Sequence, residues 1–378
     1  MKTDCREDTT LRCLIAGGGS GGHLFPAIAV VRQLQRAHAD ARFLFHVSTR
    51  PVDRQVLASA GFPNEHVAVA ESVRLPSTDV PLSRLTTLPS LWKAYRLART
   101  AVREFQPHVV VGCGALASVP AVLAAHRARI PVVLLEQNSV PGTAIRMLAS
   151  RASLTLAGLP FDRQVASRWP TPLKVPGTPI RPEISALCEQ VKPDKSNAPK
   201  LLILGGSQGS QSVNRLILQA LADEHCVPSE WQIVHQTGAP QVDDVAAEYA
   251  RRGRTARVVS FLNDLPQQLA DATVVVSRGG AGTIQELACA GVPTILIPFS
   301  KAAADHQMIN ARCLAAQAAA IVVNEQDEDA GQQLRRHLND LIRRAPLREK
   351  LSNGIREFAR PHAAAEAAAA ILQIAGLR

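Results

Sequence analysis

The sequence predicts an α/β protein made of two doubly wound domains that face a cleft, and three observations predict it. Apolar runs rich in β-branched residues alternate with stretches of helical period along both halves of the chain. Each half also carries a glycine-rich turn between such a run and such a stretch, at 16–23 and at 205–210. The 378 residues, 46% hydrophobic and 20% charged, are enough for two compact cores. We therefore expect two Rossmann-like units.

Both halves are predicted to form a parallel sheet with helices on its two faces, because their apolar runs are short and typical of buried strands. In the first half, strands are expected at 11–16, 42–47, 109–112, 132–135 and, more weakly, 154–157, and helical stretches at 26–36 and 91–105. In the second half, strands are expected at 201–204, 231–235, 257–261, 273–277, 294–298 and 320–323. This alternation is the order of elements that a doubly wound sheet requires.

A proline-rich stretch between the halves predicts where the domains are joined. Residues 169–199 contain seven prolines among charged and small residues, which is typical of an interdomain connection. We divide the chain into an N-terminal domain (1–178), a linker (179–199), a C-terminal domain (200–350) and a final segment (351–378). The alanine-rich part of that last segment has a partly apolar face, so we expect a helix that packs back toward the N-terminal domain.

Membrane-spanning, secreted and zinc-binding classes are disfavoured. The sequence has no run of 18 or more uninterrupted apolar residues, and residues 1–10 are polar with charges of both signs. We expect neither a spanning helix nor a secretory signal, and a cytoplasmic location. The seven cysteines are scattered, odd in number and never spaced as CxxC, which argues against a disulfide framework and a zinc site.

The charge of the chain points to an acidic partner. The formal net charge is +10, which suits nucleic acid, anionic lipid or a phosphorylated substrate. The sequence has no basic tract interleaved with aromatic residues, and only 4% of the residues are aromatic, so little is available for base stacking. We therefore predict no nucleic-acid partner.

The glycine-rich turns predict two anion sites, since a strand that turns through glycine into a helix leaves N–H groups and a positive dipole end free. Gly17, Gly19 and Gly22 also satisfy the GxGxxG pattern of dinucleotide-binding enzymes. An NAD enzyme needs an acidic residue at the end of the second strand, and here that strand ends in Ser48-Thr49-Arg50. This strand end excludes NAD as the cofactor and leaves an NADP oxidoreductase as an alternative. An NADP enzyme does not account for the motifs of the second half of the chain.

The second half contains a block suited to a nucleotide sugar. A glycine-rich turn follows the strand that ends at Ser277, and a helix is expected over 283–290. Glu286 falls in the first turn of that expected helix, near the sheet edge where α/β proteins bind ligands, and a carboxylate there can accept two ribose hydroxyls. The amide of Gln307 can donate and accept at once, which suits sugar hydroxyls.

Taken in order, these motifs resemble a known family. GGGSGGH at 17–23, LEQN at 135–138, GTPIR at 177–181, GGSQGS at 205–210 and SRGGAGTIQELACAGVP at 277–293 are similar to the glycosyltransferases of the two-Rossmann-domain (GT-B) type. Among those, the match from about Arg12 to Ala315 is to the enzymes that transfer N-acetylglucosamine from UDP-GlcNAc, with inversion, to the 4-hydroxyl of undecaprenyl-diphosphate-linked muramyl pentapeptide. The resemblance implies peptidoglycan synthesis by a peripheral protein on the cytoplasmic face of the cell membrane.

The resemblance also implies roles for individual residues. His23 would be the general base that takes the acceptor proton, whereas its position alone leaves a helix-capping or core histidine open. The implied donor-binding residues are Ser207, Gln208, Gly209, Leu262, Glu286, Gln307, Arg181 and Asn138. The implied acceptor or phosphate loops contribute Gly19, Ser20, Gly21, Gly22, Gly112, Gly114 and Ser118. Leu262 occupies the position whose backbone would contact uracil.

Two further segments bear on cofactors and partners. Asp327-Glu328-Asp329 spells the DxD metal signature of other glycosyltransferases, but it lies in a polar stretch and we interpret it as a solvated acidic turn. The resemblance implies no required metal and no cofactor. Residues 72–105 alternate apolar and basic side chains, which fits either an amphipathic helix packed on the sheet or a surface that rests on anionic lipid.

The departures from the family pattern fall on the acceptor side. Ala115 stands where the family has glycine, Leu116 where it has tyrosine, and Leu135 where it has histidine. The sequence therefore supports donor recognition better than the identity of the acceptor. A related GT-B enzyme acting on another lipid or natural product, and a noncatalytic sugar-nucleotide sensor, stay open beside the NADP enzyme.

Overall fold

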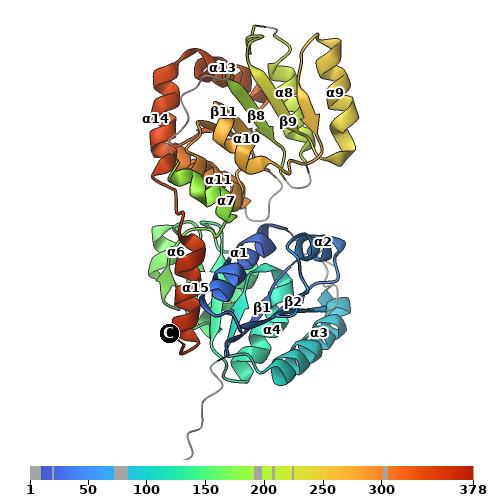
Figure 1. Ribbon diagram of the computed structural model, residues 1–378, viewed down its shortest axis with the longest axis vertical. Coiled ribbons are helices and arrows are strands. Elements are labelled where there is room, and N and C mark those ends of the chain that lie inside the picture. The colour runs from blue at the N-terminus through green and yellow to red at the C-terminus, as the bar shows by residue number, and fades with distance from the viewer. Residues whose placement is uncertain are drawn as a thin grey trace, which may run out of the picture. The chain divides into compact units, whose positions relative to one another are not determined.

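A computed structural model of the chain describes residues 10–18, 21–71, 84–190, 198–206, 209–223, 225–300 and 305–377. The chain divides into two compact units. Unit 1 comprises the residues up to Ile180 together with those from His362 onward, and unit 2 comprises Arg181–Pro361. Each unit has its own parallel sheet and its own helices (Figure 1).

The described part of unit 1 contains a seven-stranded parallel sheet in the order β3-β2-β1-β4-β5-β6-β7. The strands are β1 (Arg12–Ala16), β2 (Arg42–Val47), β3 (Val67–Glu71), β4 (Val109–Gly112), β5 (Val132–Glu136), β6 (Leu154–Ala157) and β7 (Leu173–Lys174). The central strands are buried on both faces, as their uninterrupted apolar sequences predict.

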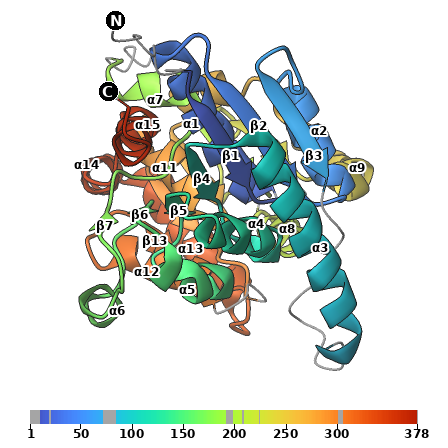
Figure 2. The same ribbon diagram turned by 90° about the horizontal axis from the view of Figure 1, so that it is seen from below.

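Helices cover both faces of this sheet. They are α1 (Gly21–Ala37), α2 (Pro51–Ser59), α3 (Arg84–Phe105), α4 (Ala115–Arg127), α5 (Thr143–Leu148), α6 (Arg163–Ser167) and α15 (Ala363–Ile374). Because side chains alternate along a strand, Cys13 and Ile15 pack with α1, α2 and α15, whereas Leu14 and Ala16 pack with α3, α4 and α5. Figure 2 shows α1 and α15 side by side on one face and α4 and α5 on the other.

The sheet of unit 2 has six strands within the described residues, all parallel, in the order β10-β9-β8-β11-β12-β13. They are β8 (Lys200–Leu204), β9 (Gln232–Gln236), β10 (Arg257–Val259), β11 (Val274–Ser277), β12 (Thr294–Leu296) and β13 (Ile321–Val322). The helices are α7 (Pro182–Ser185), α8 (Gln211–Ala220), α9 (Val242–Arg251), α10 (Leu265–Asp271), α11 (Ala281–Ala290), α12 (His306–Ala315), α13 (Ala330–Arg343) and α14 (Ala345–Arg356). Helices α8, α9 and α13 share one apolar core with β8 and β11.

The strand order places the glycine-rich turns at the two switch points. In unit 1 the order reverses between β1 and β4, and in unit 2 it reverses between β8 and β11. Ligands of doubly wound sheets bind outside the carboxyl ends of the strands at this position. The turns after β1 and β8 that the sequence singles out lie there.

The domain boundaries differ from the expected ones. Residues 182–188 form α7 and a 3₁₀ turn that contact α11, so the beginning of the expected linker is a folded part of unit 2. Within the segment 351–378, Leu351 and Ile355 of α14 are buried in unit 2, and the return to unit 1 begins at His362. Helix α15 then packs against α1 through Ala367 and Ile371 (Figure 1).

No helix in the described ranges is both long enough and apolar enough to cross a bilayer.

Candidate functional site

In unit 1, the loops that leave β1 and β4 are in direct contact. Gly17 N donates to His46 O at 3.2 Å, and Cys113 N donates to Ala16 O at 2.8 Å. A Cβ atom added at Gly17 would lie 2.9 Å from the Cβ of Cys113, so a side chain there would push the loops apart. Glycine is therefore required for this close approach of the two loops.

His23 lies in the first turn of α1, against the loop after β4. A Cβ atom at Gly114 would lie 3.2 Å from Cδ2 and 3.4 Å from Nε2 of His23. Gly114, at φ 85° and ψ −167°, precedes α4 in a backbone conformation that L-residues rarely adopt. The structure thus brings together the predicted base, Gly114 and the beginnings of two helices, whose dipoles favour negative charge.

A buried carboxylate lies beneath the first glycine turn. Asp53 is fully buried and its Oδ2 accepts a hydrogen bond of 2.5 Å from Ser48 Oγ. A Cβ atom at Gly18, where φ is 126°, would lie 2.3 Å from that same oxygen. The 2′-phosphate of NADP would need hydrogen-bond donors at the end of the second strand, and there Ser48 Oγ already donates to the Asp53 carboxyl group. This arrangement argues against the NADP alternative.

Two predicted acceptor-side residues are held by packing. A Cβ atom at Gly112 would lie 2.9 Å from both Leu134 and Val122, so glycine is needed to seat α4 on the sheet. Ser118 is fully buried, and its hydroxyl donates to Ala115 O at 2.9 Å. Gly21 and Gly22 form the first two residues of α1, whereas Gly19 and Ser20 lie outside the described residues. The acceptor roles of all of these residues stay predictions.

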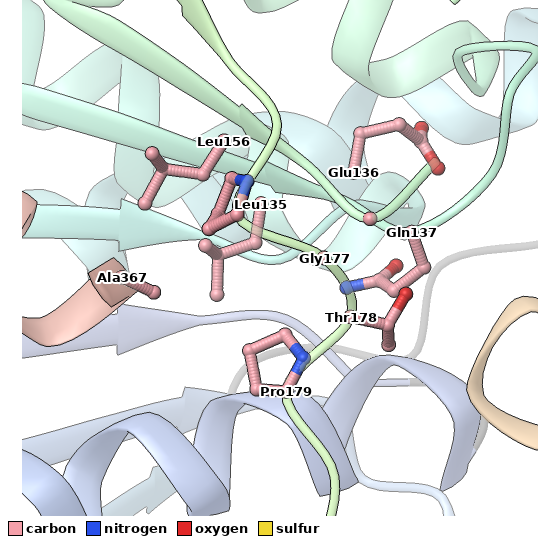
Figure 3. A pocket seen from close by; sticks show the side chains of 10 residues that line it. Leu135, Glu136, Gln137, Leu156, Gly177, Thr178, Pro179 and Ala367 are labelled. Atoms are coloured by element: carbon pink, nitrogen blue, oxygen red, sulfur yellow. The ribbon is translucent and has the colours of Figure 1, made fainter. Parts of the chain in front are cut away.

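Asn138 is oriented by its neighbour Glu136. Glu136 Oε1 accepts from Asn138 N at 2.9 Å and from Asn138 Nδ2 at 3.1 Å, and its Oε2 accepts from Gly142 N at 2.8 Å. Glu136 also lines a small pocket with Leu135, Gln137 and Thr178 (Figure 3). Its cavity volume of about 10 Å³ has room for about one water molecule and is far below the roughly 300–1,000 Å³ of ligand pockets. Leu135 contributes to the apolar lining there and is 3% exposed.

In unit 2, the turn after β8 is tied to its neighbours. Gly205 N donates to Gln236 O at 3.0 Å, and Gln236 Nε2 donates to Gly206 O at 2.8 Å and to Ser260 O at 3.0 Å. Gln236 therefore holds the predicted phosphate turn beside the segment that leads to buried Leu262. The sequence reasoning did not identify Gln236.

Gly209 is the one predicted residue of this turn that can be placed. Its φ is 76°, and a Cβ atom there would lie 2.1 Å from Thr237 O. Ser210 then caps α8, because its Oγ accepts from Val213 N at 3.2 Å. Ser207 and Gln208 lie outside the described residues, so their donor role stays a prediction.

Glu286 and Arg181, predicted to bind different parts of the donor, form an ion pair with each other. Arg181 Nη2 lies 3.1 Å from Glu286 Oε1. Burial raises the pKa of Glu286, and the charge and hydrogen bond of Arg181 act in the opposite direction. Helix α11 begins at Ala281, after the N-cap Gly280. Glu286 therefore lies in the second turn of the helix, whereas the sequence predicted the first turn. The helix starts earlier than predicted because the glycine-rich turn after β11 ends at Gly280, whose backbone is extended.

Gln307 lies in the first turn of α12 with its amide fixed. Its Oε1 accepts from Phe299 N at 3.0 Å, which orients the amide, and this oxygen has a second lone pair. The expectation that the amide both donates to and accepts from a sugar stays a prediction. A Cβ atom at Gly279 would lie 2.7 Å from Gln307 O, so glycine lets α12 approach the turn after β11.

The acidic turn and a second ion pair complete this edge of unit 2. Asp327 and Asp329 are exposed and accept hydrogen bonds from Gln333 Nε2 at 3.2 and 2.6 Å. Over the described ranges, no group of three or more His, Cys, Asp or Glu residues is arranged to hold a metal ion.

In the same unit, Arg278 and Glu325 form a buried ion pair that the sequence reasoning missed, although Arg278 belongs to the motif after β11.

Family models and curated relatives match most of the chain. The glycosyltransferase family 28 N-terminal domain matches residues 13–156, and the family 28 C-terminal domain matches residues 200–367. A protein of Syntrophotalea carbinolica is 36% identical over 84% of this chain and 86% of its own length. One of Anaeromyxobacter dehalogenans is 34% identical over 96% and 93%. Both are named UDP-N-acetylglucosamine–N-acetylmuramyl-(pentapeptide) pyrophosphoryl-undecaprenol N-acetylglucosamine transferase.

Solved structures share the fold. The crystal structure of Acinetobacter baumannii MurG is similar with a TM-score of 0.74 at 24% identity, covering 96% of this chain and 99% of that one. A UDP-GlcNAc 2-epimerase from Neisseria meningitidis, solved with UDP-GlcNAc, has a TM-score of 0.65 at 14% identity, covering 96% and 100%. These likenesses support the predicted fold of two parallel-sheet domains, known as GT-B. With family models matching both of its halves and relatives above 30% identity, the chain belongs to glycosyltransferase family 28.

Proposed function

We propose that this chain transfers N-acetylglucosamine from UDP-GlcNAc to undecaprenyl-diphosphate-linked muramyl pentapeptide, inverting the anomeric centre. The observation that carries the proposal is the likeness to relatives named for this reaction, at 36% and 34% identity over most of both chains. The arrangement of residues in each unit supports a mechanism for this transfer.

Unit 2 is assigned the donor. The carboxylate of Glu286 accepts the ribose hydroxyls, and Gln307 Nε2 donates to a sugar hydroxyl. The turn before α8 offers N–H groups and a helix dipole equivalent to about half a positive charge to the diphosphate. These groups stabilise the charge that develops on departing UDP, so the proposed reaction uses no metal and no cofactor.

Unit 1 is assigned the acceptor and the base. An imidazole nitrogen of His23 takes the proton of the muramyl 4-hydroxyl while that oxygen attacks C1 of the sugar. The new C1–O bond forms as the bond from C1 to the phosphate oxygen breaks, and UDP leaves with the electron pair. A single displacement inverts C1. General-base assistance of this kind contributes about 10² to 10⁴ in rate.

Helix α3 is assigned to an anionic membrane surface. One side of it, with Ala94, Ala98 and Val102, is buried in the core of unit 1. On the other side, Trp92 is 61% exposed, and the guanidinium of Arg96 lies 4.8 Å from the centroid of its ring. The two interpretations of this segment therefore apply to opposite faces of one helix. The first part of the alternating segment, 72–83, lies outside the described residues.

The membrane assignment rests on this exposed face, whose further basic residues are Lys93, Arg99 and Arg103. Each basic residue near an anionic membrane contributes about 1 kcal/mol. The proposed lipid-linked acceptor supports the proposal of a peripheral protein on the cytoplasmic face of the membrane. Sedimentation with phosphatidylglycerol vesicles tests this: binding is expected to weaken in salt and in Arg96→Gln, and phosphatidylcholine vesicles and Arg335→Gln serve as controls. Equal binding to both vesicle types contradicts the assignment.

The transfer is tested by turnover of UDP-GlcNAc, labelled in the sugar, with a synthetic lipid-linked muramyl pentapeptide. Labelled product is expected at equal rates with and without EDTA. His23→Ala is expected to lower kcat by about 10² to 10⁴ and to leave UDP affinity unchanged. Exposed His126 of α4 supplies the control variant, His126→Ala. Loss of turnover with EDTA, or full activity of His23→Ala, contradicts the proposed chemistry.

A second candidate is transfer of a UDP-linked sugar to another lipid or natural product. Ala115, Leu116 and Leu135 favour it, because all three depart from the family pattern on the acceptor side. Diacylglycerol offered beside the muramyl pentapeptide lipid distinguishes the two. Product on diacylglycerol alone would select the second candidate.

A further inference from the structure

The ion pair between Arg278 and Glu325 joins the loops that carry the donor-side residues of unit 2. Arg278 follows β11, Glu325 follows β13, and their Nη1 and Oε2 atoms are 2.8 Å apart. The side chains are only 11% and 7% exposed. Two buried charges at the carboxyl edge of a sheet call for an explanation other than stability, because apolar residues in such places are often as stabilising.

The terminal nitrogens of Arg278 are fully used by the protein. Nη1 donates to Glu325 Oε2 and, at 3.0 Å, to Ile297 O. Nη2 donates to Ser210 Oγ at 2.5 Å and to Ser212 Oγ at 2.7 Å. Each of these nitrogens carries two hydrogens, so four bonds account for all four. Arg278 therefore binds the beginning of α8, and none of these four hydrogens is left to bind a donor phosphate.

Glu325 fastens a second loop to the same centre. Its Oε1 accepts from Ser300 N and Ser300 Oγ, both at 2.7 Å, and its Oε2 accepts from Ser212 Oγ as well as from Arg278. Burial by itself raises the pKa of Glu325, but the hydrogen bonds of Ser212, Ser300 and Arg278 outweigh it and lower the pKa to about 2. The carboxylate is thus ionised at neutral pH.

The network continues to the residue assigned to the sugar. The guanidinium of Arg278 lies 5.3 Å from the centroid of the Phe299 ring, and Phe299 N donates to Gln307 Oε1 at 3.0 Å. A continuous set of contacts thus runs from the cap of α8, through Arg278 and the loop 297–300, to the amide of Gln307. A shift of either charge displaces both the phosphate turn and the sugar-reading amide.

We propose that Arg278 and Glu325 are positioning residues for the donor, holding the start of α8 and the amide of Gln307 in one fixed relation. The inference rests on the proposed donor role of unit 2. This ion pair itself contacts neither phosphate nor sugar. It sets the affinity for UDP-GlcNAc by fixing the start of α8 and the amide of Gln307, which are the groups assigned to the donor.

Glu325→Gln tests the proposal because it keeps the shape of the side chain and removes its charge. A group that acts on a ligand site only through the protein typically changes the affinity by about 5- to 150-fold. We expect the Kd of UDP-GlcNAc, measured by calorimetry, and its KM to rise by a factor in that range, with kcat at saturating donor within about threefold of the unmodified enzyme. Asp340→Asn, which removes an exposed ion pair with Arg344 in α13, is the matched control and is expected to change neither constant.

A double variant, Arg278→Met with Glu325→Leu, separates positioning from folding. Replacing both partners avoids leaving one charge buried and unpaired, so the double variant is expected to fold while the donor affinity falls. If the double variant is folded and binds UDP-GlcNAc within about twofold of the unmodified chain, the proposal is overturned, even where Glu325→Gln does not fold. Failure of the unmodified chain to bind UDP-GlcNAc would instead overturn the proposed function.

Discussion

Arg181 Nη2 and Glu286 Oε1 are 3.1 Å apart, so two residues 105 positions apart in the sequence form one polar centre in unit 2. The carboxylate that is assigned to the ribose is thereby held by an arginine that is itself a predicted donor-binding residue. Burial raises the pKa of this carboxyl group, and Arg181 limits the rise. Donor binding and the protonation of Glu286 are therefore linked.

Donor affinity is expected to depend on pH through Glu286. The ionised carboxylate accepts hydroxyl hydrogen bonds more strongly than the protonated group, and its raised pKa means that protonation begins at a higher pH than for an ordinary glutamate. The affinity for UDP should therefore fall as the pH is lowered. Arg181→Met removes the opposing charge, so the fall should begin at a still higher pH. Calorimetric titration of UDP across pH measures both profiles.

Glu286→Gln is the control for that experiment, since it cannot titrate. Its UDP affinity should be lower and should lack this pH dependence. Superimposable pH profiles for the unmodified chain and Arg181→Met would refute the linkage.

Gly114→Ala is expected to impair catalysis through His23. The added methyl group would lie 3.2 Å from the imidazole and would force a backbone conformation that alanine rarely adopts. The imidazole must shift, and a misplacement of about 1 Å can cost about 10²-fold in rate. The expected result is a lower kcat with an unchanged Kd for UDP, because unit 2 is untouched. A variant that loses UDP affinity and keeps kcat would contradict this assignment.

Ala115→Gly is expected to stabilise the protein. Ala115 has φ of 54°, where an L-residue costs about 1–2 kcal/mol, and glycine relieves this at a cost in backbone entropy of about 0.5–1 kcal/mol. The net gain in the free energy of unfolding should be about 0.5–1 kcal/mol, visible as a higher denaturant midpoint. The same replacement at exposed Ala247 within α9 should instead cost about 1 kcal/mol. Destabilisation by both variants would show that Ala115 is unstrained.

The buried His46 is expected to make the protein sensitive to acid. Among the residues that can be described, neither of its ring nitrogens has a hydrogen-bond partner, and burial lowers its pKa to about 4. The unfolded chain, with a pKa near 6.5, takes up the proton first, so stability falls as the pH drops from about 6.5 to about 4. The loss amounts to about 3 kcal/mol from this residue.

His46→Leu should flatten that dependence in denaturant titrations at several pH values. His235 provides the contrast within unit 2: its pKa is lowered to about 3, but Nε2 lies 3.0 Å from Asn214 Oδ1 and Nδ1 lies 3.2 Å from Tyr249 Oη. Replacing His235 with leucine should therefore destabilise at neutral pH as well, since buried polar partners are left unpaired. An unchanged acid profile in His46→Leu would be inconsistent with this interpretation.

Much of the fold is predictable because buried parallel strands have a distinctive local sequence. β2, β4 and β6 occupy the predicted ranges, since short and mostly apolar runs favour buried strands. β3 and β7 were missed, because one carries small residues and a glutamate and the other has two residues only. Helix α1 begins five residues before its predicted start, where glycines and Pro26 conceal it.

The candidate site is less predictable, because its residues meet only in three dimensions. Local motifs identified His23, Glu286 and Gln307, but not how the latter two are held. Arg278 and Glu325 are 47 residues apart and lie on different loops, so no spacing in the sequence relates them. Asp53 was missed for the same reason: its significance comes from Gly18, across a turn.

Helix α15 gives unit 1 an unusual dependence on the order of synthesis. The segment that completes this unit is synthesised only after all of unit 2 has been made. Until then α1 has an uncovered apolar side in the growing polypeptide, whereas unit 2, a continuous stretch of sequence, can close earlier. Unit 1 can therefore be completed only after unit 2 has been made.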